Sequence, residues 1–185
     1  MWDMPDVDID FADRTQLLQH VAGTPARLDT GARHNTGVYF TAVPTDTRGT
    51  ATVEHKAAEH LGYFKLDLLN VSVYERVQSE QHLRELMREP DWSRLRDRST
   101  FERLIHIGNH WDLYCTMPEP ITSIQRMAMF LAVIRPAKRH LAGETWSAVA
   151  EQVWQPPRDG SYFFKKSHSV AYAQLVVVDL NTRTP

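Results

Sequence analysis

The feature that most constrains the fold is an unbroken alternation of acidic and apolar side chains over residues 5–11, which read PDVDIDF. The apolar positions are Val7, Ile9 and Phe11, and the acidic positions are Asp6, Asp8 and Asp10. A period of two residues predicts a β-strand with one half-buried face and one acidic face. Carboxylates packed on one face repel each other unless something cationic lies between them. The strand is therefore a candidate metal site.

A second alternating segment carries a face of mixed charge. In residues 63–69, Lys65 and Asp67 point to one side of a predicted strand, and Phe64, Leu66 and Leu68 point to the other. Between the two segments we expect a helix at 13–22 that Asp13 caps, a loop at 23–37, strands at 38–43 and 50–54 around a turn at 44–49, and a short helix at 55–61.

From Val71 onward the apolar spacing becomes helical. The expected helices cover 71–88, 99–106, 121–134, 143–154 and a segment near 168–178, with prolines between several of them. A small mixed sheet followed by a helical region indicates an α+β fold. We expect a metal-binding region at 1–70 and a helical region at 71–185, packed as one compact unit.

The spacing of the acids defines the chemistry that they can support. Asp8 and Asp10 are two residues apart on one strand, so their Cα atoms lie roughly 6–7 Å apart on the same face. Such carboxylates can share two divalent cations about 3.5–4 Å apart, as in phosphoryl transfer. Asp67 would complete this set and Lys65 would neutralise a phosphate, with Asp6 as a bystander. The alternative is a solvated acidic edge with a salt bridge between Lys65 and Asp67.

The amino-acid composition limits the cellular compartments and the binding partners that we expect for this protein. The formal net charge is −2, so contact with nucleic acid would need a local basic patch or metal ions. The single cysteine, Cys115, cannot form an internal disulfide, which indicates a reducing compartment. We find no apolar run of the roughly 18 residues that a membrane span needs, and no pattern of a secretory signal. We expect a cytoplasmic protein without membrane contact.

Five segments, in order along the chain, resemble motifs of the C-family DNA polymerases, which are the alpha subunits of bacterial DNA polymerase III. They are PDVDIDF at 5–11, HNTGV at 34–38, GYFKLDLL at 62–69, AVIRP at 132–136 and FKKSHSVAYA at 164–173. Each segment is weak by itself, but the ordered set spans nearly the whole chain. The family's thumb, exonuclease and clamp-binding segments have no room here. The resemblance therefore indicates a reduced core of the kind expected from a bacteriophage, acting in the host cytoplasm.

The resemblance implies a palm of the polymerase-β-like nucleotidyltransferase type at 1–70 and a fingers-like helical region at 71–185. Asp8, Asp10 and Asp67 would hold two Mg²⁺ ions, or Mn²⁺ in their place, and Lys65 would act beside the incoming nucleotide. The implied contacts to the nucleotide or to DNA are His34, Arg135, Lys165, Lys166 and His168. The implied activity is two-metal transfer of nucleotides from deoxynucleoside triphosphates to a DNA 3′ end.

The chain also departs from the family pattern. A glycine-serine motif that holds the triphosphate is missing upstream of the acidic strand, Ala137 and Lys138 follow Arg135-Pro136 where the family has glycine and proline, and Lys165 replaces an asparagine. We therefore expect the chain to work alone, or with another replication protein that supplies the missing palm segment. Two other functions stay open: a non-catalytic module that binds DNA or a replication protein, and a metal-dependent nuclease.

Overall fold

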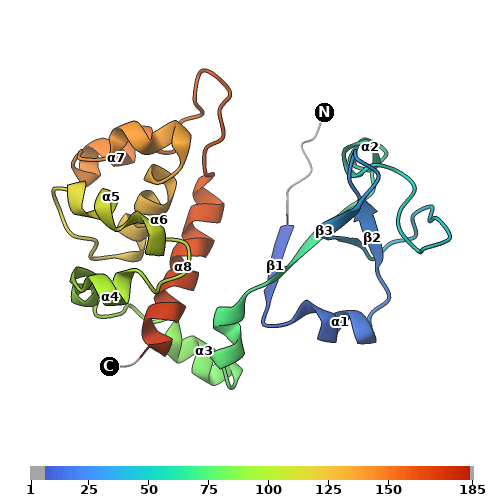
Figure 1. Cartoon of the computed structure of the whole chain (residues 1–185), viewed down its shortest axis with the longest axis horizontal. Helices are drawn as coiled ribbons and strands as arrows, with labels where there is room; N and C mark the ends of the chain where they lie inside the picture. Colours follow the sequence, from blue (N-terminus) through green and yellow to red (C-terminus); the bar gives the residue numbers. More distant parts are fainter. Residues whose placement is uncertain (1–6, 184–185) are drawn as a thin grey trace. The chain divides into compact units, whose positions relative to one another are not determined.

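The computed structural model describes residues 7–183, which form two compact units that divide between Arg76 and Val77 (Figure 1). The first unit contains a four-stranded mixed sheet and the second unit is helical, so the predicted α+β fold is confirmed at this level. The division follows the 3-10 helix η1 (Ser72–Arg76), which therefore belongs with the sheet. Pro5 and Asp6 of the predicted first strand lie outside the described residues.

The sheet has the strand order β1-β4-β3-β2. The strands are β1 (Val7–Phe11), β2 (Thr24–Arg27), β3 (Arg33–Tyr39) and β4 (Leu66–Asn70). β1 runs parallel to β4, whereas β4 with β3 and β3 with β2 are antiparallel. Strands in both alternating segments are thus confirmed, and β1 and β4 are direct neighbours at one end of the sheet.

Two short helices flank the sheet, and each begins at an acidic cap. Asp13 accepts the backbone N–H of Thr15 at 2.8 Å and starts α1 (Arg14–His20), as the sequence predicts. Glu54 accepts two backbone N–H groups and starts α2 (His55–His60). Capping side chains satisfy N–H groups that have no partner within the helix. The first unit has a small buried core of Ala26, Tyr39, Ala51 and Ala58.

The predicted loop at 23–37 is wrong, because β2 and most of β3 lie within it. Pro25 suggests a loop by its missing N–H, but β2 is an edge strand, where proline is tolerated. The predicted strand at 38–43 ends early, at Tyr39. The predicted strand at 50–54 is also wrong, since only isolated bridges form there, between Thr45 and Ala51 and between Arg27 and Glu54.

The second unit is built around α8 (Lys166–Thr182), which packs against α6 (Ile124–Val133). Its other elements are α3 (Glu80–Leu86), η2 (Trp92–Arg96), α4 (Arg98–Phe101), η3 (Gly108–His110), α5 (Trp111–Thr116), η4 (Pro136–Leu141) and α7 (Trp146–Gln152). Every residue from Leu175 to Leu180 is buried. A helix that is buried on all sides forms the centre of a helical core.

A buried carboxylate fixes the centre of this core. Asp179 of α8 is 1% exposed and accepts hydrogen bonds from the backbone N–H of Ile105 at 2.9 Å and from Arg183 Nε at 2.8 Å. Arg94 donates to the carbonyl of Leu180 at 2.9 Å and to that of Arg183. These bonds satisfy carbonyl groups near the end of α8 and tie η2 to it.

Two of the predicted helices are interrupted. The segment 71–88 forms η1 and α3, because Ser79 adopts an extended backbone and its hydroxyl accepts the N–H of His82 at 3.1 Å. The segment 99–106 leaves the α-helix after Phe101, and His106 has a positive φ of 65° that no right-handed helix accommodates. Over residues 7–183, none of the helices combines the length and apolarity that crossing a membrane requires.

Candidate functional site

The acidic face of the sheet is formed where β1 meets β4. The parallel register places Asp8 opposite Asp67, and Asp10 follows Asp8 by two residues on the same strand. Neighbouring strands lie about 4.8 Å apart, and residues directly opposite each other point to the same face of a sheet. The structure therefore places the predicted metal-binding acids on one face of the sheet, as the alternation of the sequence requires.

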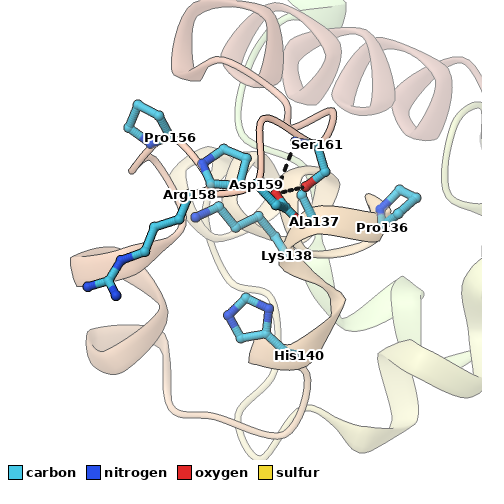
Figure 2. A pocket seen from close by; sticks show the side chains of 9 residues that line it. Pro136, Ala137, Lys138, His140, Pro156, Arg158, Asp159 and Ser161 are labelled. Carbon is cyan, nitrogen blue, oxygen red and sulfur yellow. Dashed lines mark hydrogen bonds between the residues drawn. The ribbon is translucent and has the colours of Figure 1, made fainter.

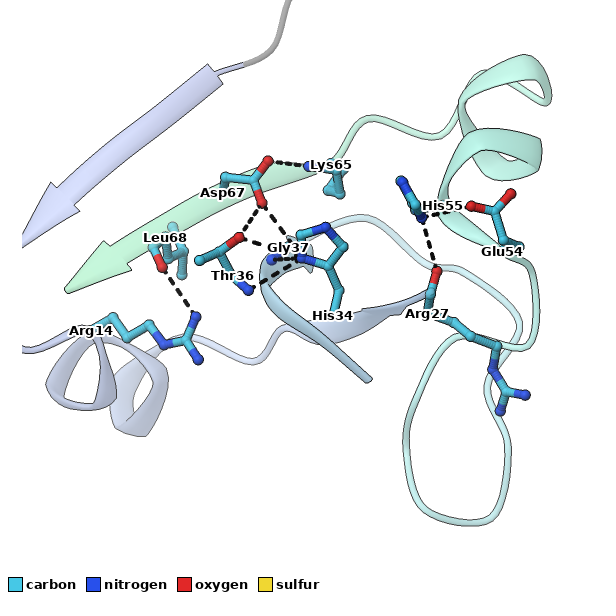
Figure 3. A network of polar contacts seen from close by, with 10 residues as sticks. All are labelled: Arg14, Arg27, His34, Thr36, Gly37, Glu54, His55, Lys65, Asp67 and Leu68. Atoms are coloured by element: carbon cyan, nitrogen blue, oxygen red, sulfur yellow. Dashed lines mark hydrogen bonds and ion pairs between the residues drawn. The ribbon is translucent and has the colours of Figure 1, made fainter. Parts of the chain in front are cut away.

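Asp67 already has two partners within the first unit. Lys65 Nζ donates to Asp67 Oδ2, and Thr36 Oγ1 donates to Asp67 Oδ1 at 2.6 Å (Figure 3). Burial alone would raise the pKa of Asp67, but the hydrogen bonds from Lys65 and Thr36, with the positive charge of Lys65, outweigh it and lower this pKa. The carboxylate is ionised at neutral pH, and an ammonium group neutralises it.

His34 lies next to Asp67, and its imidazole is neutral. Its Nδ1 accepts the backbone N–H of Gly37 at 2.9 Å and that of Thr36 at 3.2 Å, so the proton must be on Nε2. Burial lowers the pKa of His34; the charge of Asp67 opposes this shift, and Lys65 and His55 add to it. The 3.8 Å approach of His34 Nδ1 to Asp67 Oδ1 is therefore not an ion pair.

Gly37 makes room for this cluster. A Cβ atom at position 37 would lie 2.6 Å from Lys65 Cδ and 3.1 Å from His34 Nδ1. The methylene chain of Lys65 therefore passes over the bare Cα of Gly37 on its way to Asp67. A glycine at this place is a packing requirement, because close approach of other groups to a backbone excludes a Cβ.

A second set of polar contacts supports the cluster from the side of β2. Arg27 donates from Nη2 to Asp46 at 2.6 Å and from Nε to the carbonyl of Ala51 at 2.8 Å. His55 Nδ1 lies 2.6 Å from Glu54 Oε1 and 3.2 Å from the carbonyl of Arg27. The ring of His55 meets that of His34 edge to face, with centroids 5.3 Å apart. These contacts hold the loop at 44–54 against the sheet, and Figure 3 shows those of His55 with Glu54 and with the carbonyl of Arg27.

Asp10 experiences the negative charge of Asp8 on the acidic face. Partial burial raises the pKa of Asp10, and the carboxylate of Asp8 raises it further. Asp10 is also close enough to Tyr74 of η1 to contribute to a raised pKa of that phenol. Within residues 7–183, no three histidine, cysteine or acidic side chains converge closely enough to hold a metal ion together. The oxygens of Asp67 instead face Lys65 and Thr36.

The remaining predicted site residues lie in the second unit. The Arg135 guanidinium lies over the ring of Phe164, with its carbon 4.6 Å from the ring centroid, and its buried Nε has no hydrogen-bond partner among residues 7–183. His168 approaches the same ring, with centroids 6.1 Å apart. Lys165 and Lys166 are exposed at the start of α8. Arg135 and His168 thus share one aromatic neighbour, while the two lysines extend outward.

A strained histidine borders this cluster. The ring of His106 packs against that of Tyr172 at an interplanar angle of 50°, with centroids 4.2 Å apart, and the ring of Tyr172 meets that of Phe164 at 5.1 Å. Burial lowers the pKa of His106 to about 4, with a further contribution from the positive charge of Arg135, so the imidazole is neutral at pH 7. A positive φ is uncommon outside glycine, and such strain persists where surrounding contacts enforce it.

Thr36, Phe164 and His106 are absent from the residues that the sequence indicates as site members. Thr36 and Phe164 fall inside two of the segments that resemble polymerase motifs, so they could have been added as neighbours of His34 and Lys165. Nothing in the sequence marks the positive φ of His106, because the residue lies in what reads as a helix. Searches of protein-family models, of curated proteins and of solved structures find no match to this chain.

Proposed function

We propose that this chain is a nucleotidyltransferase similar to the alpha subunit of bacterial DNA polymerase III, which transfers deoxynucleotides to a DNA 3′ end. The observation that carries the proposal is the pairing of Asp8 with Asp67 across β1 and β4, with Asp10 on the same face. The donor set consists of carboxylate oxygens, which are the ligands that Mg²⁺ prefers. Asp8, Asp10 and Asp67 would hold two Mg²⁺ ions, or Mn²⁺.

The cations, when bound, would neutralise and orient the phosphates of a deoxynucleoside triphosphate. Lys65 already touches Asp67 and would exchange this carboxylate for a phosphate oxygen of the nucleotide. His34 stays neutral and holds the backbone of Thr36 and Gly37 in place, so its role is to position Asp67 through Thr36. Preorganised groups of this kind stabilise developing charge without reorganisation.

The helical unit contributes further basic side chains to the proposal. Arg135 is fixed by Phe164, and Lys165, Lys166 and His168 cluster at the start of α8. We assign these side chains to the nucleotide or to the DNA, since guanidinium and ammonium groups recognise phosphate oxygens. The proposal also includes a bacteriophage origin and action in the host cytoplasm. Both are supported only by the resemblance of the five segments to C-family polymerases.

An extension assay on primed DNA tests the proposal. The chain is incubated with four deoxynucleoside triphosphates and Mg²⁺ or Mn²⁺, alone and with other replication proteins. The proposal predicts extension that Asp8→Ala abolishes and that Asp29→Ala, which removes an exposed acid in the same unit, preserves. Absence of extension by the unchanged chain under both metals and with added proteins would contradict it. Shortening of the primer that Asp67→Ala abolishes would identify a nuclease instead.

A non-catalytic module is the second candidate, and one observation favours it. The ammonium of Lys65 donates to the Asp67 carboxylate, which would be a metal ligand in the first candidate. The chain itself therefore neutralises part of the acidic face. In this case the protein would bind DNA or a replication protein that supplies the missing palm segment. Calorimetry with Mg²⁺ and a deoxynucleoside triphosphate separates the two candidates. A module shows no binding that depends on Asp8 and Asp10.

A further inference from the structure

A hollow of about 700 Å³ opens in the second unit between η4 and the segment 156–161 (Figure 2). Lys138 and His140 border it from η4, and Arg158 and Asp159 border it from the segment 156–161. Pro136, Pro156 and Pro157 form part of its walls. None of the segments with polymerase-like motifs extends into residues 156–161. The volume lies within the roughly 300–1,000 Å³ that small-molecule sites have.

The charged groups around the hollow are mostly basic. Lys138, His140 and Arg158 are accompanied by one acid, Asp159. Asp159 Oδ1 accepts the backbone N–H of Ser161 at 3.0 Å and its hydroxyl at 2.6 Å. These hydrogen bonds lower the pKa of Asp159, so its carboxylate is ionised and turned toward its own loop. Within residues 7–183, neither Lys138 nor Arg158 forms an ion pair with this acid.

Lys138 is the most unusual of these groups, because it is only 5% exposed. Its Nζ donates to the carbonyl of Gln152, at the end of α7, at 2.8 Å. An ammonium group has three N–H donors, and in the described part of the chain only this acceptor takes one. Burial lowers the pKa of Lys138, since the charged form loses its water. An anion in the hollow would restore the lost interactions of the ammonium group.

Arg158 and His140 are the other two side chains that could donate hydrogen bonds to an anion in the hollow. Neither side chain makes a hydrogen bond or ion pair to any residue in the range 7–183. Arg158 presents a planar fork that matches two oxygens of one phosphate group. The prolines beside it restrict the backbone, so the loop needs little reordering when a ligand binds.

We propose that this hollow binds the phosphate group of a nucleotide-sized ligand, with Lys138, His140 and Arg158 as the phosphate contacts and the prolines as the wall for the sugar or base. The site does not rest on nucleotidyl transfer, because it uses no residue of the acidic face. Two sources share the required chemistry: a free nucleotide and a phosphate in a single-stranded DNA. The site therefore gives the chain a nucleotide or strand contact separate from Asp8 and Asp67.

A titration of the ¹⁵N-labelled full chain, followed by ¹H–¹⁵N correlation spectra without divalent cations, tests the site. The probes are inorganic phosphate, thymidine 5′-monophosphate and an oligothymidylate. Saturating shifts at the backbone N–H groups of Ala137, Lys138, Arg158 and Asp159 are expected. Tighter binding of the monophosphate than of the oligonucleotide identifies a free nucleotide as the source, and the reverse identifies a strand. Shifts confined to residues 165–168, or no shifts with any probe, would overturn the proposal.

Three variants, each of which removes one charged side chain, distinguish a loss of the site from a general folding defect. Arg158→Ala should weaken binding about tenfold, and Asp159→Asn should tighten it about threefold, because the amide keeps the turn and loses the charge. Arg103→Ala removes an exposed positive charge elsewhere in the same unit and should change affinity by less than about twofold. Equal affinities of the Arg158→Ala and Arg103→Ala variants would also refute the site. Loss of DNA extension by Asp8→Ala has no bearing on these results.

Discussion

Asp8 of β1 lies directly opposite Asp67 of β4, but the two carboxylates have different surroundings. Asp67 is 15% exposed as a side chain and is held by Lys65 and Thr36, whereas Asp8 is on the exposed side of the edge strand. A parallel pair in register places both acids on one face. Lys65 and Thr36 therefore preorganise Asp67, and the charge of Asp8 acts on Asp10.

Lys65→Met should tighten the binding of Mg²⁺ or Mn²⁺. The ammonium of Lys65 competes with a metal ion for Asp67, so its removal frees a ligand of the proposed site. A partly buried ion pair of about 1 kcal/mol corresponds to about a fivefold gain in affinity. Calorimetric titration of each divalent cation measures this. Lys56→Met, which removes an exposed ammonium in the same unit, is the control and should leave the affinity unchanged.

Asp67→Asn should destabilise the first unit by about 2 kcal/mol. The amide oxygen still accepts from Thr36, but Lys65, whose side chain is 16% exposed, loses its counter-ion. Urea unfolding followed by circular dichroism at pH 7 measures the change. The double variant with Lys65→Met should recover part of the loss, because no unpaired charge then remains. A double variant less stable than Asp67→Asn would contradict the described pair.

Gly37→Ala should disturb the contact between Lys65 and Asp67 by adding a methyl group beneath the Lys65 side chain. The new Cβ would meet Lys65 Cδ at 2.6 Å and Ala26 Cβ at 3.2 Å, so the lysine must move away from Asp67. We expect a loss of about 1–2 kcal/mol in the free energy of unfolding. In a Lys65→Ala background most of this cost should vanish. An equal cost in both backgrounds would show that the crowding comes from His34 and Ala26 instead.

The sequence predicts a strand in each of two regions, because alternation over residues 5–11 and 63–69 is a local pattern, although the second strand begins only at Leu66 and ends at Asn70. It does not predict which strands pair, so the position of Thr36 beside Asp67 comes only from the fold. Residues 23–37 read as a loop because of Pro25 and Gly31, and tertiary pairing overrides this local preference. In the helical unit, Ser79 interrupts a predicted helix because it caps the start of α3, and His106 adopts a conformation that its surroundings enforce.

The stability of the helical unit should fall between pH 7 and pH 5 because of His106. The unfolded histidine binds a proton near its ordinary pKa of 6.5, whereas the folded one does so only at about 4. Protons in this window bind the unfolded chain preferentially, so the stability present above about pH 6.5 is lost as the pH falls toward about 4. Because the His106 ring is partly exposed to solvent, we expect the loss in the free energy of unfolding to be about 1 kcal/mol.

Tryptophan fluorescence during urea unfolding measures this effect, since Trp92, Trp111, Trp146 and Trp154 belong to the helical unit. His106→Asn is the matched variant, because asparagine tolerates a positive φ and does not titrate in this range. The pH dependence should be smaller in this variant than in the unchanged chain. Identical pH dependence in both would assign the effect to other histidines, such as His110, whose pKa burial also lowers.

Gly108→Ala should be more damaging than Gly37→Ala. A Cβ at position 108 would overlap the backbone carbonyl of Glu102, which cannot rotate away as the side chain of Lys65 can. Gly108 also donates its N–H to the carbonyl of Leu104 at 3.0 Å, so its backbone is fixed. We expect a loss of about 3 kcal/mol or more, measured as the midpoint of thermal unfolding by fluorescence. A shift no larger than that of Gly37→Ala would contradict this packing.

Calorimetric titration of Mn²⁺ into the full chain tests the central claim most directly, because it asks whether the acidic face of β1 and β4 holds a divalent cation. We expect saturable binding by the unchanged chain and by Asp29→Asn, and loss of that binding in Asp8→Asn and in Asp67→Asn. Binding that Asp8→Asn leaves intact, or no binding by the unchanged chain, would contradict the account.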